Sequence, residues 1–423
     1  GKESLFSNTT ASNNTAVGTA SLKANTTGST NVAIGRKTMC TNTTGANNTA
    51  IGNQSLEQNT TASNNTAFGY LSLNANTTGY QNTAVGACAL DSNTTGETNT
   101  AVGHTSLCNN TTGSNNTGIG KNALLSNTTA TVNTAVGRDA LKVNTTGGSN
   151  TAVGHAALQA NTTANDNVAV GREAMYTNTT GTENTAVGHD ALYSNTTENS
   201  NSAFGFQALR ANTNDANTGI GYRALCSNTS GCLNTALGTS AGRDITTGDN
   251  NLTLGYFAGR SSSPSGAITT GNNNVVLGDD NISNLFCADT SISSSDLRDK
   301  TDIEDFTHGL DFVTKLNPKT YRWDKRSWYT TNDDQSILDV TPDGSKKRNK
   351  KHIGFLAQDV LALEKEIGFA NDRDDMLVVN QTEDETRYGL KYERLVPVLV
   401  NAIKELSEEN KDLKSRIEAL ESN

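Results

Sequence analysis

A 17-residue repeat with the consensus NTAVGxxALxxNTTGxx constrains the fold of this chain more than any other feature. Sixteen copies follow one another, the first beginning at Asn14 and the last at Asn274. The spacing slips by one residue at Asn217 and includes a six-residue insertion around Pro264. The fifth position is glycine in every copy. A short unit repeated at a fixed period is typical of a solenoid, in which each unit forms one coil.

Each unit predicts two short strands and two turns. In the first copy, Thr15–Val17 predicts one strand, and the Ala-Leu-like pair four residues later, Ser21 and Leu22, predicts a second. We expect the fixed glycine, here Gly18, to turn with a positive φ or to allow a close approach of backbones. The segment Asn25–Gly28 predicts the second turn, because Asn and Gly both accept left-handed geometry. Sixteen coils stacked at the strand spacing of about 4.8 Å predict a rod of roughly 75 Å.

Side chains alternate between the two faces of a strand, so Ala16 and Val17 are expected to point in opposite directions, as are Ser21 and Leu22. One set fills the thin interior. The other set, mostly alanine, is small and suits close contact with a neighbouring chain. Only about a third of the residues are hydrophobic, 34%, so such a coil has little core of its own. We therefore expect oligomerisation to stabilise the solenoid.

The motifs NTAVG and NVAIG resemble the head repeats of trimeric autotransporter adhesins of the YadA type. This resemblance covers roughly residues 4–278, although the period here is longer than in typical members. It implies a left-handed parallel β-roll that forms a homotrimer. The chain begins inside a repeat, and we expect upstream sequence through which other virion proteins would be contacted.

The composition changes after Asp280, where the repeats stop and a serine-rich linker begins. Four sequence blocks follow in order: SDLRDK at 295–300, LNPKTYRW at 316–323, GFLAQDV at 354–360 and YERLVP at 392–397. Together they resemble the intramolecular chaperone auto-processing domain that ends phage endosialidase tailspikes and phage fibre proteins.

That resemblance implies a catalytic dyad of Ser295 and Lys300, and one cut beside Ser295, which we place at the Ser294–Ser295 bond. A serine hydroxyl is a weak nucleophile until a nearby base takes its proton, and a desolvated lysine can be that base. Attack on an adjacent carbonyl is intramolecular, so proximity supplies much of the rate. Read without its neighbours, Ser295 would instead be a helix N-cap.

Three further residues are candidate supporting groups for this site. Asp296 and Arg298 are expected to hold its geometry rather than to do chemistry, and His352 would orient a site group or make a structural hydrogen bond.

The end of the chain predicts a coiled coil. Leucines recur every seven residues, and the alternate core positions hold two isoleucines and one asparagine (Leu399, Leu406, Leu413, Leu420; Ile403, Asn410, Ile417). A buried asparagine at such a position sets register and oligomer state. Both resemblances imply three strands.

The predicted fold is therefore mainly β: a trimeric parallel β-solenoid over 1–280, a linker over 281–294, a small α+β chaperone domain over 295–398 and a coiled coil over 399–423. The predicted function is that of a virion fibre or spike shaft that attaches to a host receptor or glycan. Its chaperone would drive trimerisation and solenoid folding, cut itself off once as a serine peptidase, and be released in the host cytoplasm during assembly. No external substrate is expected.

Several alternatives are weaker. A net charge of −10 disfavours nucleic-acid binding, and the basic run at 346–351 fits a solvated loop. The sequence contains no apolar stretch of about 18 residues, so membrane insertion is not expected. The six cysteines show no metal or disulfide framework, so neither a metal nor a cofactor is expected. A bacterial trimeric surface adhesin is the main rival; an ice-binding rod and a glycan-degrading spike, which needs paired carboxylates, are less well supported.

Overall fold

The computed structural model describes residues 1–284, 295, 297–330, 337–382 and 385–422. These form two compact units: residues 1–259 with 269–277, and residues 260–268 with 278–423. The insertion around Pro264 thus belongs to the second unit, although it lies in sequence between two strands of the first.

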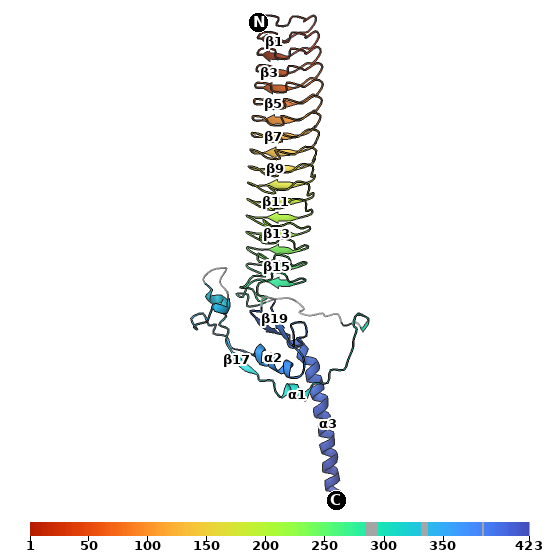
Figure 1. Cartoon of the computed structure of the whole chain (residues 1–423), viewed down its shortest axis with the longest axis vertical. Helices are drawn as coiled ribbons and strands as arrows, with labels where there is room; N and C mark the ends of the chain where they lie inside the picture. Colours follow the sequence, from red (N-terminus) through yellow and green to blue (C-terminus); the bar gives the residue numbers. More distant parts are fainter. Residues whose placement is uncertain (285–294, 296, 331–336, 383–384, 423) are drawn as a thin grey trace. The chain divides into compact units, whose positions relative to one another are not determined.

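The first unit is a β-solenoid, as predicted. Its strands stack one after another in chain order (Figure 1), forming one parallel sheet of sixteen strands. Equivalent residues of successive copies pair with one another, for example Ala33 with Ala50. The strands are β1 (Thr15–Val17), β2 (Val32–Ile34), β3 (Thr49–Ile51), β4 (Thr66–Phe68), β5 (Thr83–Val85), β6 (Thr100–Val102), β7 (Thr117–Ile119), β8 (Thr134–Val136), β9 (Thr151–Val153), β10 (Val168–Val170), β11 (Thr185–Val187), β12 (Ser202–Phe204), β13 (Thr218–Ile220), β14 (Thr235–Leu237), β15 (Leu252–Leu254) and β16 (Val275–Leu277).

Each coil has one strand, so the prediction of a second strand at the Ala-Leu pair is wrong. That pair lies in a turn, with Ala20 at φ 57° and Leu22 at φ 49°. Left-handed backbone costs an L-residue roughly 1–2 kcal/mol. Complete burial of the leucine contributes about 1.5–3 kcal/mol, and its N–H still donates to the next coil, from Leu22 to the Thr38 carbonyl at 3.0 Å. The turn therefore keeps its stacking bonds without an extended backbone.

The fixed glycine adopts the predicted positive φ, 127° at Gly18. It is also needed for space, because a Cβ at Gly18 would lie 2.4 Å from the carbonyl oxygen of Gly35. The second turn forms at Asn25–Gly28, but the left-handed residue of this region is Thr30, at φ 61°. Gly28 serves the close approach alone, since a Cβ there would lie 2.3 Å from the Gly45 carbonyl oxygen.

The interior of the solenoid reverses the predicted division of side chains. Ala16 of β1 is half-buried, and from β2 onward the strand alanines, such as Ala33, are fully buried and pack inside the coil with the turn leucines, such as Leu56. The residue after each alanine points outward, and Val17 is 55% exposed. Ser21 is buried beside Leu22, because the turn does not alternate faces as a strand would. The thin coil has room for a methyl group opposite each leucine, so the larger β-branched residue takes the outside.

Two columns of buried asparagines run through the solenoid, one at the first position of the repeat and one in the NTTG segment. Asn99 and Asn110 represent the two columns, and both donate from Nδ2 to the carbonyl oxygen of Gly113, each at 2.9 Å. Asn110 also donates to Asn93 Oδ1 in the preceding coil at 2.8 Å. Stacked amides therefore close each coil and tie it to the next, which satisfies polar groups that water does not reach.

The second unit is a small α+β domain that ends in a long helix. Its strands form two antiparallel pairs, β17 with β18 and β19 with β20. The elements are η1 (Leu297–Asp299), α1 (Leu310–Val313), β17 (Lys319–Tyr321), η2 (Arg326–Tyr329), η3 (Ile337–Asp339), β18 (His352–Gly354), α2 (Ala357–Glu366), β19 (Val379–Gln381), β20 (Tyr388–Leu390), η4 (Tyr392–Arg394) and α3 (Leu395–Glu421).

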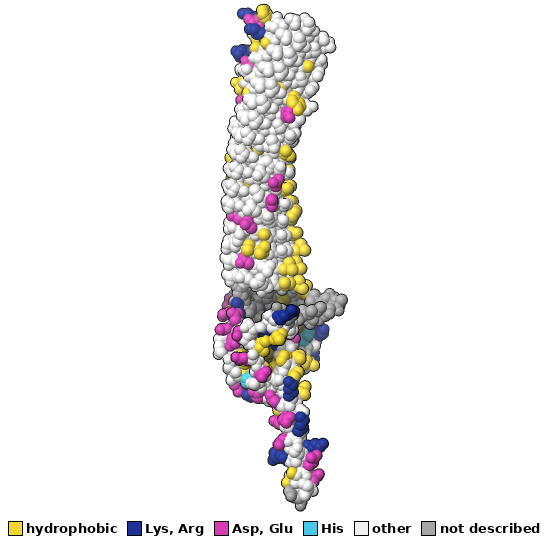
Figure 2. All heavy atoms as spheres, turned by 90° about the vertical axis from the view of Figure 1, so that its right-hand side faces the viewer, with side chains coloured by type: hydrophobic (Ala, Val, Ile, Leu, Met, Phe, Trp, Pro, Cys, Tyr) yellow, Lys and Arg dark blue, Asp and Glu magenta, His cyan; other side chains and the backbone are white. Residues whose placement is uncertain are grey.

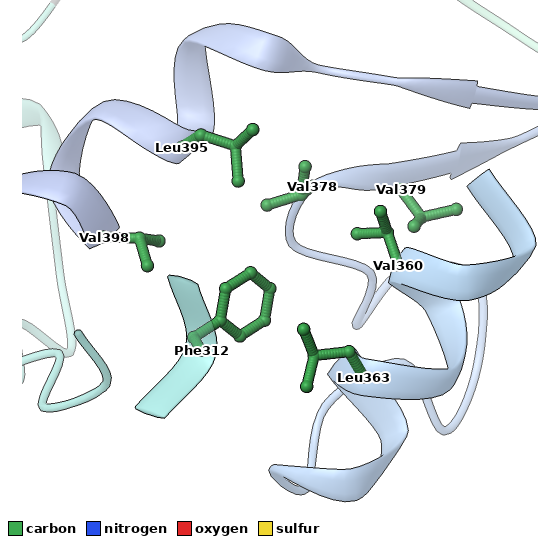
Figure 3. Close-up of a cluster of buried hydrophobic side chains, with 7 residues drawn as sticks. All are labelled: Phe312, Val360, Leu363, Val378, Val379, Leu395 and Val398. Carbon is green, nitrogen blue, oxygen red and sulfur yellow. The ribbon is translucent and has the colours of Figure 1, made fainter. Parts of the chain in front are cut away.

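One hydrophobic cluster joins α1, α2, the start of β19 and α3 (Figure 3). Its buried members are Phe312, Val360, Leu363, Val378, Val379, Leu395 and Val398. Beside it the buried carboxylate of Glu364 accepts hydrogen bonds from the N–H groups of Leu377, Val378 and Val379, at 3.1, 2.6 and 2.9 Å. These three bonds hold the chain entering β19 against α2.

Candidate functional site

The predicted pair Ser295 and Lys300 lies together. The Nζ of Lys300 donates a hydrogen bond to Ser295 Oγ at 2.8 Å. The one-turn helix η1 lies between them, and the Lys300 N–H donates to the Leu297 carbonyl at 3.2 Å, which turns the chain back toward Ser295. Both residues are exposed in the single chain. The geometry is that of a serine with a lysine amine at proton-transfer distance, and the catalytic roles stay predictions.

The other predicted site residues divide between described and undescribed parts of the chain. Ser294 and Asp296 lie outside the described residues, so the structure does not describe the predicted scissile bond between Ser294 and Ser295. Arg298 lies in η1 and is exposed. His352 begins β18, where its ring lies 5.8 Å from that of Tyr321 and 6.2 Å from that of Trp323. These ring contacts place His352 in an aromatic cluster, and its role at the site stays a prediction.

Residues 295–369 match a protein-family model described as the chaperone of endosialidase. This part of the chain is a chaperone-of-endosialidase domain. The match begins at Ser295 itself and includes the first three of the four sequence blocks. No curated protein and no solved structure matches the chain.

The chaperone domain needs residues beyond the matched segment to complete its core. Phe312, Val360 and Leu363 belong to the match, whereas Val378, Val379, Leu395 and Val398 of the same cluster follow it. The fourth block, at 392–397, supplies η4 and the start of α3. The folded unit is therefore longer than the family match.

A continuous row of large apolar side chains follows the outer face of the solenoid sheet. We call this the apolar row; it holds the last residue of every strand, and none of them is buried. Figure 2 shows hydrophobic side chains gathered along one edge of the solenoid. The members of the apolar row are Val17, Ile34, Ile51, Phe68, Val85, Val102, Ile119, Val136, Val153, Val170, Val187, Phe204, Ile220, Leu237, Leu254 and Leu277. Contiguous exposed apolar surface is uncommon on monomeric soluble proteins.

The helix α3 confirms the predicted C-terminal helix and carries a second exposed apolar face. The predicted core leucines and isoleucines are all exposed in the single chain (Leu399, Ile403, Leu406, Leu413, Ile417 and Leu420). Asn410, predicted to set register, donates to the Leu406 carbonyl of its own helix at 2.8 Å. The heptad face is therefore free to pack against other helices, and the coiled coil itself stays a prediction.

Sequence reasoning missed a buried ionic cluster around Asp280. This carboxylate is 3% exposed and lies 2.6 Å from Arg387 Nη1 and 3.2 Å from Lys325 Nζ. The Ser327 hydroxyl also donates to it. The insertion at Pro264 was the signal that the coil beginning at Asn251 differs from the others, but the partners of Asp280 lie far along the chain.

Other classes of site have little support in the described part of the chain. Among those residues no group of three or more His, Cys, Asp or Glu side chains is arranged to hold a metal ion. No described helix has the length and apolar character needed to cross a membrane. The five described cysteines are free thiols (Cys40, Cys88, Cys108, Cys226 and Cys232).

Proposed function

We propose that the chain is the shaft of a trimeric virion fibre whose chaperone domain assembles three copies and then cuts itself off at Ser295. The observation that carries this proposal is the hydrogen bond between Ser295 and Lys300 at the first residue of the chaperone domain.

The proposed cut proceeds through an ester. Lys300, in its neutral form, takes the proton from Ser295 Oγ, which attacks the carbonyl carbon of residue 294. The carbon–nitrogen bond breaks, the Ser295 nitrogen receives the proton and becomes an amine, and residue 294 is held as an ester on Oγ. Water then hydrolyses the ester, which gives a carboxylate at residue 294 and restores the serine hydroxyl. Each chain is cut once and no outside substrate is needed.

The exposure of the pair couples this step to assembly. Lysine serves as a base when removal of water favours its neutral form. Lys300 is exposed in the single chain, so neighbouring chains must supply that burial. Cleavage would then mark a completed assembly, and its irreversibility would trap the shaft kinetically.

Two exposed apolar faces support self-association of the chain. The apolar row and the heptad face of α3 lie in different units, and each is long and continuous. A single polar solenoid coil has little core, so burial of the apolar row between copies would supply the missing apolar contact. A parallel α3 coiled coil would bring equivalent residues of the copies to the same level.

Register is the problem that such a chaperone would solve. Coils in the array are nearly identical, so three solenoids shifted by one coil would differ little in energy. A clamp at the C-terminal end would fix the alignment of the three C-terminal coils, and the remaining coils would then pair in order toward the N-terminus.

Host attachment would use the variable side chains that follow each fixed glycine. These exposed or half-buried positions differ from coil to coil, for example Tyr70, Arg138 and Phe206. Ladders of rings occur here, since Phe206 stacks on Tyr222 with centroids 5.4 Å apart. We infer that a host-surface protein or glycan is bound along this face of the assembled virion.

The test compares wild type with Ser295→Ala and Lys300→Arg on a denaturing gel, with intact masses. We expect wild type to split between residues 294 and 295 and both variants to stay whole, because arginine keeps the charge but cannot act as a base. Ser291→Ala, a neighbouring linker serine, is the matched control and should split like wild type. A wild-type chain that stays whole, or a Ser295→Ala chain that splits, would refute the self-cleavage.

A further inference from the structure

The ionic cluster around Asp280 joins chain segments from both sides of the proposed cut. Asp280 and the insertion residues 260–268 precede Ser295, whereas Lys325, Ser327 and Arg387 follow it. All of them belong to the second compact unit. We propose that this cluster is a docking site that keeps the severed chaperone fragment bound to residues 260–280 after the backbone is cut. The inference rests on the proposed self-cleavage.

Arg387 is the central residue of the docking site. Its Nη1 lies 2.6 Å from Asp280 Oδ2, and its Nη2 donates to the Ser261 carbonyl at 2.6 Å. One guanidinium therefore holds both the insertion and the exit from the last coil. The Asp280 N–H donates to the Ser262 carbonyl at 2.8 Å, which ties these two segments to each other.

Lys325 and Ser327 complete the cluster from η2 and the residue before it. Lys325 Nζ lies 3.2 Å from Asp280 Oδ1 and donates to the Asp280 carbonyl at 3.2 Å. The Ser327 hydroxyl donates to Oδ2. Both oxygens of the buried carboxylate are thus occupied by groups from the C-terminal side of Ser295.

Burial makes these contacts hard to break. A buried carboxylate that loses its cationic partners has a much higher free energy than a carboxylate in water. Truncation of one partner of a buried ion pair therefore destabilises the folded contact strongly. None of these contacts includes a residue of the 285–294 segment, and hydrolysis at residue 294 breaks none of them. The two fragments would therefore part only when the cluster opens.

The insertion explains why this site occurs at one coil. The array has a 23-residue spacing between Asn251 and Asn274, where its other spacings are 16 or 17. The added residues include Ser261 and Ser262, whose carbonyls bind the cluster. Docking through them distinguishes the insertion-bearing coil, which begins at Asn251, from the other fifteen copies, which the shared repeat sequence cannot do.

The test follows the two fragments of the full assembled chain on native size-exclusion chromatography after cleavage. We expect the wild-type fragments to elute together and to separate in denaturant. Asp280→Asn keeps the shape of the side chain but removes both ion pairs, and should raise the rate of fragment dissociation by about a hundredfold or more. Asp279→Asn is the matched control, because the Asp279 carboxylate accepts hydrogen bonds from the nearby Asn281.

A second variant covers the case in which Asp280→Asn fails to fold. Arg387→Lys keeps one positive charge but cannot reach both Asp280 and the Ser261 carbonyl, so we expect an intermediate loss of retention. Wild-type fragments that separate at once, or variants that hold together as tightly as wild type, would overturn the docking role.

Failure of self-cleavage is separated from failure of docking by a second cut. A Ser295→Ala chain with a site-specific protease sequence inserted in residues 285–294 is cut by the added protease instead. If its fragments stay together and Asp280→Asn releases them, docking stands whether or not Ser295 is a nucleophile. If they part as soon as they are cut, the docking site is refuted independently of the dyad.

Discussion

Replacement of Asn110 by alanine tests whether the asparagine columns stabilise the solenoid. Asn110 donates to Asn93 Oδ1 and to the Gly113 carbonyl, and its Oδ1 accepts from Asn127 Nδ2 at 2.8 Å. In the alanine variant Gly113 keeps its bond from Asn99, and Asn127 keeps its bond to Ala130. Asn93 Oδ1 loses the donor that stacks on it.

The expected cost follows from that one buried acceptor. An orphaned buried acceptor costs about 1–3 kcal/mol, and the lost amide contacts add about 1 kcal/mol, so we expect a local destabilisation of roughly 2–4 kcal/mol. Asn109→Ala is the matched control, because Asn109 is the preceding residue and is exposed. It should change stability by less than about 0.5 kcal/mol.

Hydrogen exchange followed by mass spectrometry measures this difference locally. In peptides spanning residues 93–127, exchange should be about 30- to 700-fold faster in Asn110→Ala than in wild type, since each tenfold corresponds to about 1.4 kcal/mol. Coils far from the substitution should change little, because repeats interact with their neighbours only. Equal exchange in the two alanine variants would show that the column satisfies polar groups without net stabilisation.

Two further predictions concern the apolar row and the thiols. Val136→Asp together with Val153→Asp places charges in the middle of the apolar row, and sedimentation velocity should show a shift toward monomer. Val143→Asp is the control, because Val143 is exposed outside the row, and it should leave association unchanged. Unchanged association of the double variant would exclude the row as an interface. Burial, with the nearby Asp91, raises the pKa of the Cys108 thiol to about 11, so its reactive thiolate is scarce below that pH. Alkylation at pH 8 should be at least about 100-fold slower in the folded chain than in urea, with the gap closing toward pH 11; equal rates would contradict the burial.

The number of coils and their start points could be predicted from the sequence, because Asn and Gly recur where the backbone needs them. The second strand could not. A pair such as Ser21 and Leu22 carries no mark that distinguishes an extended segment from alternate left-handed residues, and leucine seldom takes that geometry. The choice depends on whether the next coil can bury the side chain, which is a tertiary effect.

The faces of the sheet were assigned in reverse for a related reason. Alternation shows that Ala16 and Val17 point in opposite directions but not which of them points inward. The expectation that the larger residue fills the core holds for proteins with a wide hydrophobic core. Here the turn leucines occupy the interior from the opposite side, and the remaining depth fits a methyl group, such as that of Ala33.

The candidate site could be predicted from the sequence only in part. Ser295 and Lys300 are five residues apart, and a local turn is enough to join them. Asp280 and Arg387 are brought together by the fold of the whole second unit, and no local pattern relates them. Motifs predict contacts of the first kind, whereas buried ion pairs between distant segments require a structure.

The in-register pairing of equivalent residues also bears on how such a gene changes over time. The internal coils from the copy at Asn31 to the copy at Asn217 share the fixed glycine and both buried asparagines, and their strands pair in register. Unequal recombination between the near-identical coding units would therefore add or delete whole coils and leave each new junction correctly bonded. Rod length would then vary in heritable steps of about 4.8 Å, while the single insertion and Asp280 stay at the C-terminal end of the array.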